Sequence, residues 1–162
     1  LAPILAKGHY EVTAVDISPD MLNIARNSYS DVGLFNTRFF ISDAEVISQQ
    51  LGSEIYDAVI CLRLMHRVPQ PVRLKILQEI SRVANYSIVS FGVKSQYNNI
   101  RKKIRNLIFW ERNNSEELCL ESIYNIECDL SNFFQPVKKI WVSKYLSEEV
   151  FFLLKSKVFD PG

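Results

Sequence analysis

Three short apolar runs, each closed by a polar or thiol residue, organise the first part of the chain. They predict β-strands over residues 12–16, 38–43 and 56–61. The last residues of these runs are Asp16, Asp43 and Cys61. In open parallel sheets, ligands bind beyond the carboxyl ends of the strands. These three side chains are therefore the first candidates for a binding site.

A helix is predicted between the first two strands. Ser18 can cap its N-terminus, Pro19 suits the first helical position, and Asp20 suits the positive end of the helix dipole. Strand, helix and strand in this order predict two parallel strands joined by a right-handed crossover. Asp16 and Asp43 should then end neighbouring strands.

The middle of the chain predicts a further strand, loop, helix and strand. The strand over 56–61 is apolar enough to be central and buried on both faces. After a loop over 63–71, an apolar stripe at helical spacing is formed by Val72, Ile76, Ile80 and Val83. Residues predicted to face solvent on this helix are Arg73, Lys75, Gln78, Glu79 and Arg82. Residues 86–91 form the next strand.

Two more apolar runs near the end predict strands over residues 137–143 and 150–155. The polar connection over 146–149 leaves no room for a crossover helix, so this pair should be antiparallel. The predicted fold class is α/β, with a mostly parallel sheet and an antiparallel C-terminal strand pair.

Residues 94–112 have a different character. They contain six basic residues and a single acid, Glu111, and their apolar residues fall on one side of a helix. Such a basic amphipathic helix has two interpretations. It packs on its own domain with a solvated basic face, or it serves as a lid or a membrane-surface contact for a lipid-like substrate.

Composition narrows the class of protein. The 162 residues, 48% of them hydrophobic, predict one domain over 1–162, with 94–134 as a helical substrate or lid insertion. A net charge of +1 gives no general argument for nucleic-acid binding. Three cysteines without CxxC spacing and two histidines predict neither metal site nor disulfide framework, which fits a reducing cytoplasm. No apolar run approaches the roughly 20 residues of a transmembrane helix.

The first eight residues suggest that the chain is a fragment. They read as the end of a helix with Gly8 as its terminator. A strand that should precede this helix is absent from the sequence.

Three motifs in order resemble the class I S-adenosylmethionine-dependent methyltransferases. Residues 15–26 are similar to that family's second-strand signature, residues 43–45 to its third-strand motif, and residues 56–68 to its fourth. The resemblance covers nearly the whole chain. It implies a Rossmann-like methyltransferase sheet, an enzyme, and S-adenosylmethionine as the cofactor.

The resemblance also implies roles for the first two strand ends. Asp16 would accept hydrogen bonds from both ribose hydroxyls, and Ile17 would offer an apolar face to adenine. Asp43 would accept from the adenine amine while the backbone N–H of Ala44 donates to the ring. The alternatives are that Asp16 merely ends a strand before a helix cap and that Asp43 is a turn residue.

The third strand end offers a catalytic candidate. Cys61 and Leu62 would pass under the methionine part of the cofactor, although a buried core position also favours cysteine. His66 is placed to take a proton from a hydroxyl or amine acceptor. Proximity and desolvation can drive methyl transfer without a base, so His66 could instead orient a loop or line the pocket.

One departure from the family stands out. The family's first strand and its glycine-rich turn do not occur in this sequence, and that strand would lie between those ending at Asp16 and Cys61. The sheet should therefore be interrupted. This chain alone should bind cofactor poorly, and the activity would belong to the parent sequence.

Two other function classes compete with methyl transfer. An NAD-dependent oxidoreductase could use Asp16 on its own ribose, but the antiparallel closing pair and the loop after Cys61 argue against it. A non-catalytic methyltransferase-like domain could bind a partner protein. Within the methyltransferase interpretation, the acceptor is expected to be a small or lipid-like molecule rather than nucleic acid, with peripheral membrane contact through 94–112 left open.

Overall fold

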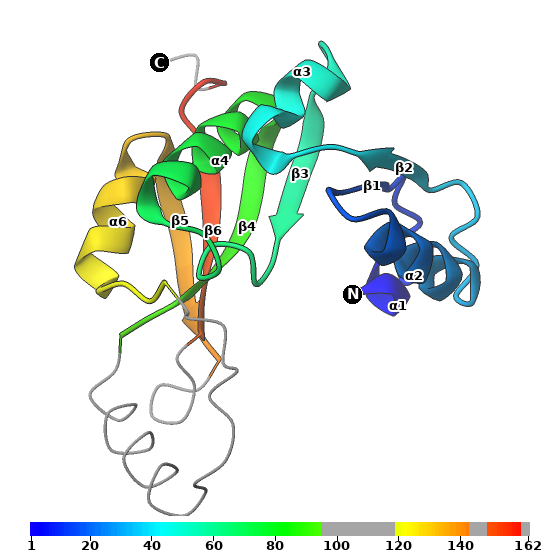
Figure 1. Ribbon diagram of the computed structural model, residues 1–162, viewed down its shortest axis with the longest axis horizontal. Coiled ribbons are helices and arrows are strands. Elements are labelled where there is room, and N and C mark those ends of the chain that lie inside the picture. Colours follow the sequence, from blue (N-terminus) through cyan, green and yellow to red (C-terminus); the bar gives the residue numbers. More distant parts are fainter. Residues whose placement is uncertain (95–118, 143–148, 160–162) are drawn as a thin grey trace, which may run out of the picture. The chain divides into compact units, whose positions relative to one another are not determined.

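The computed structural model describes residues 1–94, 119–142 and 149–159. They form two compact units, Leu1–Gly52 and Ser53–Gly162. Each unit has its own sheet, so the predicted interruption is confirmed (Figure 1).

The first unit contains a parallel sheet of two strands. Its elements are α1 (Ala2–Lys7), β1 (Thr13–Asp16), α2 (Pro19–Ser30), β2 (Arg38–Ile41), the 3₁₀-helix η1 (Ala44–Val46) and α3 (Ile47–Leu51). Thr13 of β1 lies opposite Arg38 of β2, and Asp16 lies opposite Ile41. The predicted strand–helix–strand arrangement is confirmed.

Helix α2 begins as its sequence predicts. The backbone N–H of Met21 donates to Ser18 Oγ at 3.3 Å, and Pro19 occupies the first helical position. On the side toward β2, the guanidinium of Arg26 lies 4.8 Å from the centre of the Phe39 ring. This cation–π contact helps to hold α2 on the short sheet.

The second unit is built on a four-stranded mixed sheet. Its elements are β3 (Tyr56–Cys61), α4 (Gln70–Val83), β4 (Ala84–Gly92), α6 (Ile123–Ser131), β5 (Phe134–Trp141) and β6 (Glu149–Ser156). The strand order is β3-β4-β6-β5. β3 and β4 are parallel, whereas β6 is antiparallel to both β4 and β5. The predicted antiparallel closing pair is confirmed.

The core of the second unit lies between this sheet and the helices α4 and α6, which pack on one side of it (Figure 1). β6 alternates strictly, and its inward side chains Val150, Phe152 and Leu154 are buried. Phe152 contacts Phe91 of β4 edge to face, with ring centres 5.7 Å apart. The alternation is that of a strand with one face on the core.

The prediction that residues 56–61 form a central strand buried on both faces is wrong. β3 ends the order of the four-stranded sheet, and β4 is its single strand neighbour among the described residues. Asp57, Ala58 and Ile60 are exposed. An apolar run reports which residues favour burial, not whether a neighbouring strand is present to bury them.

The prediction that the charged residues of α4 face solvent is wrong at two positions. Arg73 is 1% exposed and Glu79 is 6% exposed. Arg73 is kept inside by carboxylates from other elements, and Glu79 Oε1 accepts from Arg82 at 2.6 Å. Charged side chains are buried only when paired, and sequence periodicity does not reveal the partners.

Several predictions fall outside the described residues. The basic amphipathic helix predicted over 94–112 does so beyond Lys94, as does most of the 146–149 connection. Within the described end of the predicted helical insertion, residues 123–131 form the helix α6.

Candidate active site

Asp16 and Asp43 lie at the carboxyl ends of adjacent strands in the first unit. Asp16 is the last residue of β1, and β2 ends two residues before Asp43. The ladder continues one step past β2, where the backbone N–H of Ser42 donates to the carbonyl of Asp16 at 3.2 Å. The structure therefore brings the two carboxylates to one end of one sheet, as predicted.

The backbone fixes one oxygen of each carboxylate. Asp16 Oδ1 accepts from the N–H of Ser18 at 2.8 Å, and Asp43 Oδ1 accepts from the N–H of Glu45 at 2.9 Å. Within the described part of the chain, neither Oδ2 has a hydrogen-bond partner. Each aspartate thus presents a preoriented acceptor oxygen, which is the chemistry that hydroxyl and amine donors require.

The residues that follow each aspartate differ in exposure. Ile17 is 66% exposed and directly follows the half-buried Asp16. Ala44 is half-buried and opens η1, for which Asp43 is the cap residue with φ −74° and ψ 136°. An apolar surface and a helix-opening backbone amide therefore accompany the two carboxylates.

Cys61 and Leu62 belong to the second unit, at and just after the end of β3. Cys61 is half-buried and Leu62 is 40% exposed. Burial raises the pKa of the Cys61 thiol to about 12. Burial therefore favours the protonated thiol over the nucleophilic thiolate at neutral pH.

The loop after β3 is held in a specific conformation. Arg63 has φ 62°, in the left-handed region that costs a non-glycine residue roughly 1–2 kcal/mol. Its backbone N–H donates to Ser90 Oγ of β4 at 2.8 Å. This contact over 27 residues of sequence ties the loop to the central strand.

His66 is buried in this loop, at 8% exposure. Its carbonyl accepts from the N–H of Cys119 at 2.7 Å. A Cβ built on Gly92 would lie 3.0 Å from His66 Cβ, so the absence of a side chain at Gly92 makes room for the histidine. Burial lowers the pKa of His66; Glu149 opposes this effect, while Arg67 and Arg63 add to it. A neutral imidazole at physiological pH is the form that a general base needs.

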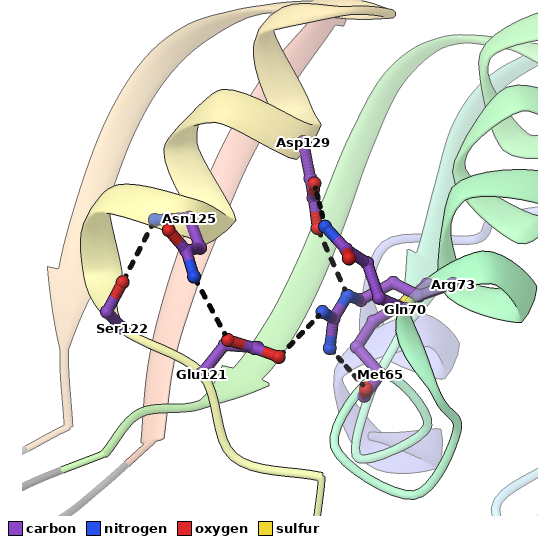
Figure 2. Close-up of polar contacts among 7 residues, drawn as sticks. All are labelled: Met65, Gln70, Arg73, Glu121, Ser122, Asn125 and Asp129. Atoms are coloured by element: carbon purple, nitrogen blue, oxygen red, sulfur yellow. Dashed lines mark hydrogen bonds and ion pairs between the residues drawn. The ribbon is translucent and has the colours of Figure 1, made fainter.

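A buried arginine supports the loop from the side of α4. Figure 2 shows Arg73 between the Met65 carbonyl, Glu121 and Asp129. Nη1 donates to the carbonyl at 3.4 Å, Nη2 lies 3.6 Å from Glu121 Oε1, and Nε lies 3.4 Å from Asp129 Oδ2. The two carboxylate distances are those of ion pairs without hydrogen-bond geometry.

The same cluster extends to α6 and the segment before it (Figure 2). Gln70 Nε2 donates to Asp129 Oδ1 at 2.9 Å, and Asn125 Nδ2 donates to Glu121 Oε2 at 3.2 Å. We call Gln70, Arg73, Glu121 and Asp129 the Arg73 cluster. It joins Met65, the start of α4, and α6. The loop between β3 and α4 (residues 62–69), which we call the histidine loop, is therefore supported by a charged cluster centred on the buried Arg73 and Asp129.

The sequence did not identify the Arg73 cluster, although one signal was available. Arg73 precedes Ile76, Leu77 and Ile80 at spacings of three, four and seven, which places it on the buried face of the helix. Among the described residues, no group of three or more His, Cys, Asp or Glu side chains is arranged to hold a metal ion. No helix among them has the length and apolarity needed to cross a bilayer.

The family of the chain follows from comparison with known proteins. The model of a family described as a methyltransferase domain matches residues 1–86, more than half of the 162-residue chain. This stretch includes both aspartates, the end of β3 and His66. The chain belongs to this methyltransferase family.

Solved structures agree on the fold. Magnesium protoporphyrin IX methyltransferase from Synechocystis PCC 6803, with bound SAH, is 24% identical, with a TM-score of 0.75 over 96% of this chain and 69% of that one. The PH0226 protein from Pyrococcus horikoshii OT3 is 20% identical, with a TM-score of 0.70 over 95% and 75%. N-methyltransferase NodS from Bradyrhizobium japonicum WM9, also with SAH, is 7% identical, with a TM-score of 0.64 over 91% and 67%.

No curated protein matches the chain by sequence. Family and fold nevertheless confirm the predicted class of enzyme, a class I methyltransferase that depends on S-adenosylmethionine.

Proposed function

We propose that this protein binds S-adenosylmethionine at the ends of β1 and β2 and transfers its methyl group to a small-molecule or lipid-like acceptor. The observation that carries the proposal is the position of Asp16 and Asp43 on adjacent strand ends, each with one oxygen fixed by the backbone. The two carboxylates are thus oriented to accept hydrogen bonds from the hydroxyl and amine groups of a nucleoside.

The two aspartates bind different parts of the cofactor's nucleoside. Asp16 accepts from the ribose hydroxyls through the oxygen that Ser18 leaves open, with charge-assisted hydrogen bonds. Ile17, 66% exposed, covers one face of the adenine. Asp43 accepts from the adenine amine, and the N–H of Ala44 donates to a ring nitrogen.

The end of β3 contributes to the other half of the cofactor. Cys61 and Leu62 line the methionine portion, and the protonated thiol of Cys61 is a neutral lining group there. In the transfer step, the acceptor atom attacks the methyl carbon in line, the carbon–sulfur bond breaks, and the sulfonium becomes a neutral thioether. Holding the acceptor and the methyl group in near-attack geometry supplies most of the acceleration.

His66 is the proposed general base. An acceptor hydroxyl or amine must release a proton, and a buried neutral imidazole can take it. Replacement of His66 by Gln should lower kcat on the order of 100-fold, with the KM for S-adenosylmethionine nearly unchanged. Undiminished turnover would remove His66 as the base and leave it as a loop or pocket residue.

The acceptor class is inferred from the neighbouring structures and from the sequence. One of the solved structures is a magnesium protoporphyrin IX methyltransferase, and another is an N-methyltransferase. These two neighbours support a small-molecule acceptor. The lipid-like alternative and the membrane contact rest on the basic sequence of 94–112. Sedimentation of the protein with anionic vesicles at low salt would support the membrane contact, and absence of binding would rule the contact out.

Equilibrium binding of S-adenosylmethionine and NAD to the full-length protein tests the proposal. We expect binding of S-adenosylmethionine alone. Asp16→Asn should weaken it about 10- to 100-fold, because a hydrogen bond to a charged group contributes about 1.5–3 kcal/mol. Asp20→Asn, which removes the same charge from the first turn of α2, is the matched control. Preference for NAD, or equal loss in both variants, would contradict the proposal.

Ala44→Pro tests the backbone contact separately. Proline removes the N–H but suits the first position of a helix, and Asp43 already has the extended conformation that a following proline requires. The fold should persist while affinity for S-adenosylmethionine falls several-fold. Unchanged affinity would show that this amide does not reach adenine.

A further inference from the structure

The imidazole of His66 has an unsatisfied nitrogen. Nδ1 is buried and has no hydrogen-bond partner among the residues that the structure describes. A neutral imidazole carries its proton on one of two nitrogens, and the hydrogen bond made by one nitrogen decides which of them can act as a base. Whatever group approaches Nδ1 therefore controls the reactive nitrogen, Nε2.

Gly92 shows which face of the sheet carries His66. A Cβ built on this last residue of β4 would lie 3.0 Å from His66 Cβ and 3.3 Å from Cγ. A side chain at position 92 would therefore point toward Cβ and Cγ of His66. A residue beside Gly92 in the sheet, with its side chain on the same face, therefore lies near the His66 side chain.

Glu149 is that neighbour. It is the first residue of β6 and lies opposite Gly92 in the antiparallel β4–β6 ladder; the two strands run side by side in Figure 1. Directly opposite residues of an antiparallel pair project from the same face, with Cβ atoms about 4.5–5.5 Å apart. Oε1 of Glu149 and Nδ1 of His66 are both shielded from solvent.

The surrounding charges favour an interaction between the two side chains. Burial lowers the pKa of His66, Glu149 raises it, and Arg67 and Arg63 of the histidine loop lower it further. The backbone N–H of Cys119, from the segment before α6, donates to the His66 carbonyl. Glu149 is thus the carboxylate that compensates a positive charge on this imidazole.

We propose that Glu149 is a positioning residue for His66, accepting a hydrogen bond from Nδ1–H so that Nε2 remains unprotonated. The inference rests on the proposed function, in which His66 is the base. The acceptor gives its proton to Nε2 as its oxygen or nitrogen bonds to the methyl carbon. The carbon–sulfur electron pair stays on sulfur, and Glu149 stabilises the imidazolium formed.

Histidine NMR of the isotope-labelled protein tests this inference without substrate or cofactor. The chain has two histidines, and His9 lies in the other unit, so its signal is an internal reference. We expect neutral His66 to be mainly the Nδ1–H tautomer. A mainly Nε2–H tautomer in the unaltered protein would overturn the proposal, whatever any variant does.

Glu149→Gln should lower the pKa of His66 and reduce the share of the Nδ1–H tautomer. Glu149→Asp should preserve both. Glu127→Gln, which removes the same charge from a surface pair with Lys139, is the matched control and should leave His66 unchanged. A His66 titration and tautomer unaffected by Glu149→Gln would overturn the proposal. Because binding of S-adenosylmethionine is measured separately, such a failure would leave the proposed function standing.

Discussion

The two units of the chain differ in how they are held together. In the first unit, the buried hydrophobic side chains are Ala2 and Leu22. In the described part of the second, they number fifteen, including Leu77, Phe91 and Phe152. The first unit has a two-stranded sheet and the second a four-stranded one. The proposed nucleoside-binding residues, Asp16 and Asp43, therefore belong to the weakly packed unit, and the proposed base, His66, belongs to the strongly packed one.

This difference has a physical consequence. An isolated pair of strands is marginally stable in water, and the first unit exposes apolar side chains such as Phe35 at 77% and Ile17 at 66%. Ligands that bind the native state stabilise it by mass action. A nucleoside held by Asp16 and Asp43 should thus order the first unit more than the second, whose core is already complete.

The largest effect is expected from the Arg73 cluster. Arg73→Met leaves Asp129 and Glu121 without their cation and should lower the free energy of unfolding by about 3–5 kcal/mol. Lys139→Met breaks an exposed pair with Glu127 and should cost less than about 1 kcal/mol. Urea denaturation measures both. Equal midpoints for these variants would mean that the buried cluster does not support the second unit.

Hydrogen exchange should separate the units directly. Backbone amides in the β1–β2 ladder should exchange on the order of 100-fold faster than those in the β4–β6 ladder, because they open without exposing a core. Added S-adenosylmethionine should slow exchange in β1 and β2 while leaving β4 and β6 nearly unaffected. Equal protection in the two ladders would show that the two units do not differ in stability.

A smaller effect is expected at Gly92, where β4 meets the histidine loop. The Cβ introduced by Gly92→Ala would lie 2.6 Å from Leu120 Cδ2 and 3.0 Å from His66 Cβ. Overpacking of this kind costs about 1–3 kcal/mol. Combining it with Leu120→Ala removes one of the two clashes and should recover part of the loss. A stable, unchanged Gly92→Ala variant would show that the loop yields easily.

The pH dependence of stability should carry the smallest signal. Because the pKa of His66 is lowered in the folded protein, the unfolded chain binds the proton more readily. The contribution of His66 is present above its unfolded pKa of about 6.5 and is lost as the pH falls through the folded value. Unfolding between pH 7 and 5 should show a gentler slope in His66→Gln, and an unchanged slope would contradict the burial effect.

The local elements of the fold could be predicted from the sequence because their signals are local. The cap at Ser18, the proline at Pro19 and the apolar stripe of α4 depend on neighbours within a few residues. The parallel pairing of β1 and β2, and hence the adjacency of Asp16 and Asp43, followed from the single crossover helix between them.

Features that depend on distant partners could not be predicted in this way. Arg73 was predicted to face solvent because Asp129, 56 residues later, is not visible in its periodicity. Glu149 was assigned to a polar connection, although in the structure it starts β6 opposite Gly92. The edge position of β3 likewise reflects its neighbours and not its own sequence.

The proposed contact between Asp16 and the ribose of the cofactor can be tested by changing the protein and the ligand in turn. The Kd values of S-adenosylhomocysteine and its 2′-deoxyribose analogue would be measured for the unaltered full-length protein and for Asp16→Asn. We predict that loss of the hydroxyl weakens binding about tenfold or more in the unaltered protein and very little in the variant, since a hydrogen bond to a charged group contributes about 1.5–3 kcal/mol. The same loss in both proteins would show that Asp16 does not hold the ribose.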